Sequence, residues 1–204
     1  MPLIDLTHTF GSPMPVFPGD PPATLTEIAS VREDGFSNHL LSCGMHTGTH
    51  MDAPMHFIDS GLNISELGLS RLIGPAILLD ARGQQQLQLS LLDGVTVRRE
   101  LAVLILTGHD KHFGKPEYYQ AYPLITPELG RKLTDSGVRL LGLDTPSPDD
   151  SPFAIHQQLL GAGIPIIENL TGLELLLDSG EFELMALPLK VEAGGAPVRV
   201  VARL

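Results

Sequence analysis

Three histidines and one aspartate lie within the eleven residues 46–56. Imidazole nitrogen and carboxylate oxygen are the natural ligands of zinc and of other divalent transition metals. His50 and Asp52 are two positions apart, so on extended backbone they point to the same side. Gly48 lets the chain turn sharply after His46, and Pro54 argues against a regular helix. The cluster therefore predicts a metal-binding turn and short extended segment, after a strand that ends near residue 45.

A second pair of candidates lies downstream. His156 falls on a helix that Pro152 opens, and Glu168 follows twelve residues later, after an apolar strand. An ionisable residue at the carboxyl end of a strand is well placed for function in an α/β sheet. Spacing alone favours the other interpretation, a surface histidine on an amphipathic helix and a glutamate that caps a loop. Both interpretations stay open at this point.

The elements that must position these residues alternate between strand and helix in the second half of the chain. Helix starts and ends are indicated at Thr126-Pro127 and Gly137, at Ser151-Pro152 and Gly161 or Gly163, and around residues 172–178. Strands rich in Val, Ile and Leu are predicted at 4–10, 23–29, 38–45, 76–81, 102–107, 140–144, 165–167, 182–187 and 198–202. We expect one α/β domain over residues 1–204, with a mixed sheet and flanking helices.

Composition excludes several classes of function. The chain carries 24 acidic and 13 basic side chains, a net charge of −11, which argues against nucleic-acid binding. Its single cysteine, Cys43, rules out an intramolecular disulfide and a multi-cysteine zinc site. No apolar run approaches the roughly 18–20 residues of a membrane span. No basic leader precedes Asp5, so we expect a cytoplasmic protein that contacts neither membrane nor nucleic acid.

The segment at residues 46–57 resembles the signature of a known family. It matches His-x-Gly-Thr-His-x-Asp-x-Pro-x-His-Phe at every specified position. This is the signature of the metal-dependent cyclase family of hydrolases, which includes bacterial kynurenine formamidases and isatin hydrolases. The resemblance covers nearly the whole chain, because residues 4–8, 14–20 and 184–189 are also similar to family segments, and His156 and Glu168 have the expected separation.

The resemblance implies a role for each matched residue. His46, His50 and Asp52 would hold a first divalent ion, and Asp52 would bridge to a second ion held by His156. Glu168 would complete the set of metal residues. His56 would be the proton donor and acceptor, and Phe17 would be the aromatic residue of the substrate loop. Zinc is the expected metal, as one or two ions, with manganese as the alternative.

The implied fold is a swivelling β/β/α domain, commonly a homodimer. The implied activity is hydrolysis of an amide, formamide or cyclic amide of a small molecule by metal-activated water. The chain departs from kynurenine formamidases in having Phe17 where a tryptophan is expected, and in the stretch around His109 and His112. Alternatives are a cyclase, dehydratase or lactonase acting on a cyclic substrate, and a metal-containing binding protein without turnover. His109 and His112 either line the pocket or belong to a solvated loop.

Overall fold

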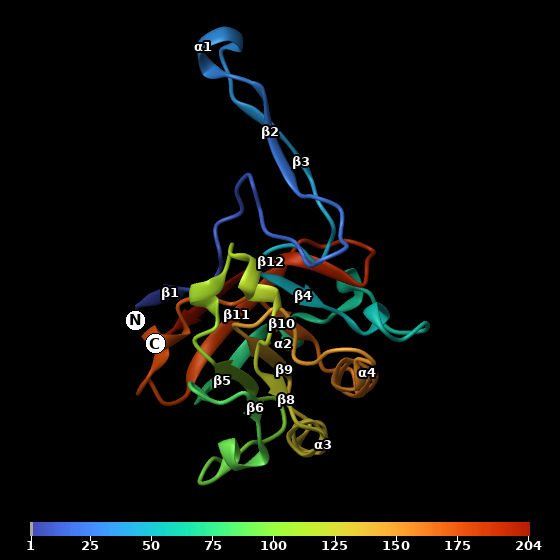
Figure 1. Ribbon diagram of the computed structural model, residues 1–204, viewed down its shortest axis with the longest axis vertical. Coiled ribbons are helices and arrows are strands. Elements are labelled where there is room, and N and C mark those ends of the chain that lie inside the picture. Colours follow the sequence, from blue (N-terminus) through green and yellow to red (C-terminus); the bar gives the residue numbers. More distant parts are fainter. Residues whose placement is uncertain (1) are drawn as a thin grey trace.

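A computed structural model describes residues 2–204 and shows a mixed sheet that closes on itself (Figure 1). Strands follow the order β1-β12-β11-β5-β7-β9-β10-β4, and β4 also pairs with β12. The pairs β5–β7, β7–β9 and β9–β10 are parallel, and the other pairs are antiparallel. The bounds are β1 Leu3–Asp5, β4 His50–Asp52, β5 Ile73–Asp80, β7 Ala102–Leu106, β9 Leu140–Leu143, β10 Ile166–Glu168, β11 Phe182–Pro188 and β12 Gly195–Arg203.

Apolar side chains cover the sheet on both faces, which explains why its parallel strands are continuously hydrophobic. All five residues of β7 are buried. Leu104 and Leu106 join one apolar cluster, whereas Val103 and Ile105, which point the other way, join the second. The second cluster lies under α3 (Pro127–Ser136) and α4 (Ala154–Gly161), which pack against each other.

The remaining elements are short. The α-helices α1 and α2 span Val31–Asp34 and Leu69–Leu72. The one-turn 3-10 helices are η1 Pro54–His56, η2 Ile64–Glu66, η3 Leu89–Leu92, η4 Asp110–His112, η5 Pro116–Tyr119 and η6 Leu173–Leu176. Two small sheets pair β2 (Thr24–Ala29) with β3 (Asn38–Ser42), and β6 (Gln86–Leu87) with β8 (Leu124–Ile125). Within residues 2–204, no helix has the length and apolar character needed to cross a membrane.

The mixed α/β class and the sheet with flanking helices are confirmed, but three predicted elements differ. The strand predicted at residues 4–10 is shorter, because β1 ends at Asp5. The backbone N–H of His8 donates to the hydroxyl of Thr49, so the chain has left β12 by that point. The helix opened at Pro152 begins at Ala154, because Phe153 has a left-handed backbone. The helix predicted around 172–178 is the single turn η6, since Gly172 and Asp178 both have positive φ.

One segment leaves the body of the molecule. β2, α1 and β3 form a hairpin arm over residues 24–42 that extends away from the closed sheet (Figure 1). No residue of β3 or α1 is buried. Large apolar side chains on the arm are at least half exposed: Ile28, Val31, Phe36, Leu40 and Leu41. The arm thus presents an apolar surface that the described part of its own chain does not cover.

Candidate metal centre

Strand β4 places two of the expected ligands at the seam of the closed sheet. It lies between β10 and β12, with His50 opposite Glu168 on one side and Asp52 opposite Gly195 on the other. Side chains alternate along a strand, so His50 and Asp52 share a face while Met51, fully buried, points into the apolar core. The predicted extended segment is therefore confirmed, and it brings Glu168 beside His50 across 118 residues of sequence.

The buried carboxylates and imidazoles come within a few ångströms of one another. Nε2 of His50 lies 3.3 Å from Oε2 of Glu168 and 3.5 Å from Oδ1 of Asp52. Nε2 of His156, from α4, lies 3.1 Å from Oε1 of Glu168 and 3.6 Å from Oδ2 of Asp52. The structure thus brings together the residues proposed from two distant segments, and His156 is buried rather than a surface residue.

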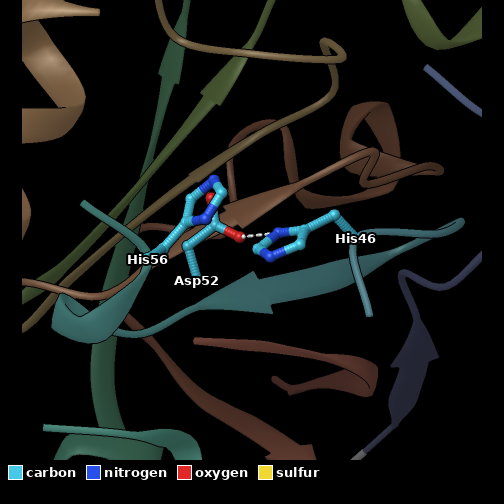
Figure 2. Close-up of side chains that lie close together, drawn as sticks. All are labelled: His46, Asp52 and His56. Carbon is cyan, nitrogen blue, oxygen red and sulfur yellow. Dashed lines mark hydrogen bonds and ion pairs between the residues drawn. The ribbon is translucent and has the colours of Figure 1, made fainter. Parts of the chain in front are cut away.

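His46 and His56 complete the cluster on its more open side. Figure 2 shows Asp52 next to both residues, with Nδ1 of His46 2.7 Å from Oδ1 of Asp52. The rings of His46 and His56 stack with centroids 3.9 Å apart. Gly48 makes this return of the chain possible, because its φ is +65° and a Cβ there would lie 2.4 Å from Cε of Met14.

The donor set fits a divalent cation. Two groups of side chains have ligand atoms within 4.8 Å of one another, His50, Asp52 and Glu168 in one group and His46, Asp52 and His56 in the other. Within the described residues, Nε2 of His50 and Oδ2 of Asp52 are buried without a hydrogen bond. Buried polar atoms are normally satisfied, so two ligand atoms without a hydrogen-bond partner fit a site that holds a cation. Asp52 belongs to both groups, which allows one ion or two.

The buried carboxylates of the cluster stabilise positive charge on the groups next to them. Burial by itself would lower the pKa of His50, but Glu168 and Asp52 outweigh that effect and raise the pKa to about 9. Burial would likewise raise the pKa of Asp52, but the neighbouring imidazoles of His156 and His46 hold it well below its ordinary value. A cation placed among these carboxylates would meet the same favourable field.

Two buried residues that support the cluster were missed at the sequence level. Asp149 accepts hydrogen bonds from the backbone N–H groups of Ile155 and His156, and its Oδ1 lies 2.5 Å from Nδ1 of His156. Such a carboxylate–histidine pair orients a metal-binding imidazole. Asn169, next to Glu168, contacts the turn that carries His50. An aspartate shortly before a helix was the available signal for Asp149, whereas Asn169 gave none.

A cavity of about 280 Å³ opens onto the cluster. Phe17 lies in its wall, 37% exposed and edge-on to Tyr119. His109 and His112 are not among the residues that line it. The described lining residues are Pro15, Phe17, Asp20, His46, Gly48, His50, His56, Phe57, Tyr119, Pro146, Ser147, Phe153, His156, Glu168 and Asn169. Aromatic and apolar side chains make up much of its wall, and its polar lining includes the imidazoles and the glutamate of the cluster.

We expect Gly195→Ala to weaken binding of a divalent ion by about 10–100-fold, the range that follows changes around a ligand. A Cβ at this position would lie 2.4 Å from Cε1 of His46, so the ring must leave the position that sets its Nδ1 2.7 Å from Asp52. The dissociation constant for Zn²⁺, measured by chelator competition, checks this. Gly11→Ala is the control, because a Cβ there meets nothing within 4 Å. Equal affinities in the two variants would contradict the expected position of His46.

The chain is similar to known proteins over almost its full length. The model of the putative cyclase family matches residues 4–150. Kynurenine formamidase from Bacillus cereus is 35% identical over 98% of this chain and 96% of its own, and the Bacillus cytotoxicus protein is 32% identical over the same shares. Isatin hydrolase A from Labrenzia aggregata superposes with a TM-score of 0.87 at 27% identity, over 98% of this chain and 93% of that one. A predicted metal-dependent hydrolase from Bacillus stearothermophilus gives 0.80 at 25% identity, covering 98% and 97%.

Proposed function

The chain belongs to the putative cyclase family, and from that premise and its site we propose which reaction it performs. It is a metal-dependent hydrolase that acts on C–N bonds other than peptide bonds, in a small amide, formamide or cyclic amide. One observation carries the proposal. Ligand groups from two distant segments converge on buried Asp52, at the end of a cavity lined by aromatic side chains.

We propose His46, His50, Asp52, His156 and Glu168 as the residues that hold the metal, with Asp52 shared between two positions. When bound, a divalent ion supplies a Lewis acid that polarises a carbonyl and lowers the pKa of water toward about 7. Zinc is the metal we propose, because the set mixes imidazole and carboxylate donors, and manganese is the alternative. Asp149 keeps the His156 ring oriented through its Nδ1.

His56 is the proposed general base and acid. Desolvation lowers the pKa of His56 to about 4, so its imidazole is neutral at pH 7 and can accept a proton. The ring stacks on His46 at the cavity wall, where a nitrogen can take a proton from attacking water and return it to the leaving nitrogen. The aromatic wall that includes Phe17 is proposed to hold a planar substrate against this group.

The experiment that tests the proposal combines elemental analysis of the purified protein with assays on N-formylkynurenine, isatin, a simple lactam and a lactone. We expect bound zinc and hydrolysis of one of the C–N substrates, with a product heavier than a cyclic substrate by one water. Turnover of the lactone alone, or loss of water from a cyclic substrate, would favour the lactonase or dehydratase alternative. Bound metal without turnover of any of these substrates would favour the alternative of a metal-containing binding protein.

We also propose that two copies of the chain pair through the arm at residues 24–42. An isolated hairpin is marginally stable in water, so exposed apolar residues on both of its strands need a covering surface. In a symmetric pair each copy covers the arm of the other at the same time. We further propose that residues 1–204 form a single domain, of which residue 1 lies outside the described residues. The proposed location is the cytoplasm.

We expect Phe36→Asp with Leu40→Asp to convert a dimer into a monomer. Both side chains are 58% exposed in the single chain, so charges there leave its fold intact but cannot be buried at an interface. Light scattering after size exclusion is the measurement, with a mass of twice 21.9 kDa expected before substitution and 21.9 kDa after it. Leu89→Asp, on η3, is the control and should stay dimeric. An unsubstituted protein that elutes as a monomer would contradict the arm's role.

A further inference from the structure

A chain of buried hydrogen bonds runs from Tyr118 to the imidazole of His50. The hydroxyl of Tyr118 donates to Oδ1 of Asn169 at 2.7 Å. Nδ2 of Asn169 donates to the carbonyl oxygen of Gly48 at 2.9 Å. The same carbonyl lies 2.9 Å from Nδ1 of His50. Tyr118 is fully buried and Asn169 nearly so, and neither has a role in the proposed reaction.

The carbonyl oxygen of Gly48, the central acceptor of this chain, sets its donors and acceptors. A carbonyl oxygen only accepts, so Nδ1 of His50 must carry the proton that faces Gly48. The amide of Asn169 must turn its NH₂ group toward Gly48, because the reverse orientation would set two oxygens against each other. Burial raises the pKa of Tyr118, so its hydroxyl keeps its proton and donates to Oδ1 of Asn169.

The consequence falls on the other nitrogen of the ring. When a cation takes the place of the proton on Nε2, the proton that remains is held on Nδ1, and Nε2 directs a lone pair toward the space beside Asp52 and Glu168. This is the nitrogen that has no hydrogen bond within the described residues. A lone pair at that position is what a metal ligand needs.

The backbone of Asn169 strengthens the same assignment. Its φ is +57°, a left-handed conformation that asparagine tolerates better than most residues. Its carbonyl accepts a hydrogen bond from the hydroxyl of Thr49 at 2.6 Å, so both ends of the residue hold the turn before β4. Nδ2 also lies 3.3 Å from Nδ1 of His50, so any change at this side chain is felt directly by the ring.

We propose that Asn169 and Tyr118 are positioning residues that hold Gly48 and thereby fix the tautomer and orientation of His50 toward the metal. This inference rests on the proposed metal site. Tyr118 acts only through Asn169, which orients the carbonyl of Gly48, and neither residue is among the proposed metal ligands. Loss of such an outer contact lowers metal affinity by about 10–100-fold.

The test is a double-mutant cycle on Zn²⁺ affinity, measured by chelator competition on metal-free protein. Asn169→Gly deletes the side chain and suits the positive φ, and Tyr118→Phe deletes only the hydroxyl. We expect Asn169→Gly to weaken Zn²⁺ binding by about 10–100-fold and Tyr118→Phe to weaken it by a smaller factor. Because the hydroxyl acts through the amide, the double variant should bind no more weakly than Asn169→Gly alone.

Thr171→Val is the matched control, since it deletes a hydroxyl on the same segment that bonds Asp110 instead. It should leave Zn²⁺ affinity unchanged. The inference would be overturned if the losses of Zn²⁺ affinity in the two single variants multiplied in the double variant. It would also be overturned if Asn169→Gly bound Zn²⁺ as tightly as the control. If Asn169→Gly does not fold, Tyr118→Phe alone tests the inference. In the zinc-loaded Tyr118→Phe protein, the Nδ1 proton of His50 should exchange with solvent faster than in the unsubstituted protein. An unsubstituted protein that binds no Zn²⁺ would refute the proposed function instead.

Discussion

Replacing Asp52 by asparagine is expected to abolish both metal binding and hydrolysis. Asp52 is the member common to the two ligand groups, and its carboxylate is 1% exposed. The amide has one acceptor oxygen and no charge, so neither group keeps its shared anionic ligand. The loss of affinity should exceed the roughly 10–100-fold that follows loss of an outer contact. Elemental analysis and turnover of the identified substrate, measured on the same preparation, check both losses together.

Asp150→Asn provides the matched control for this substitution. Asp150 is an exposed carboxylate beside Asp149, and its neutralisation changes the net charge by the same amount without altering the cluster. Metal content and turnover should equal those of the unsubstituted protein. If Asp52→Asn keeps a full complement of metal, the ligand assignment built on Asp52 is wrong. If it loses metal but keeps turnover, the metal is not part of the reaction.

The local part of the site was predictable because its information is local. Three of the expected ligands, His46, His50 and Asp52, lie in one seven-residue stretch, and alternation along an extended strand already places two of them on one face. A turn at Gly48 follows from the freedom of glycine at positive φ. Phe17 lies in the cavity wall, and its role in binding substrate stays a prediction.

The rest depends on pairings between distant segments, which spacing does not determine. Glu168 meets His50 only because β10 runs antiparallel to β4, and that register is set by the closure of the sheet. Spacing alone favoured a surface position for His156. Only the packing of α4, the helix that carries it, shows that the side chain is buried. Asp149 and Asn169 act through hydrogen bonds to backbone groups, which any polar residue can make and no periodicity signals.

Replacing His56 by alanine separates the two roles that its position permits. His56 belongs to one of the candidate ligand groups and is also the proposed proton-transfer group. If it transfers protons, kcat should fall by about 10²–10⁴-fold while the metal content stays unchanged. Desolvation lowers the pKa of His56 to about 4, so its imidazole is neutral at pH 7 and free to accept a proton. Single-turnover kinetics with elemental analysis of the same sample measure both quantities.

Met55→Ala is the control for this last substitution, because Met55 precedes His56 on the same 3-10 turn and is 40% exposed. Its kcat and metal content should match the unsubstituted protein. Loss of metal together with activity in His56→Ala would make His56 a ligand rather than a base. Unchanged kcat with metal retained would exclude both roles, and proton transfer would then need another group at the cavity wall. The buried ligands would keep their assignment in either case, because the group formed by His50, Asp52 and Glu168 does not include His56.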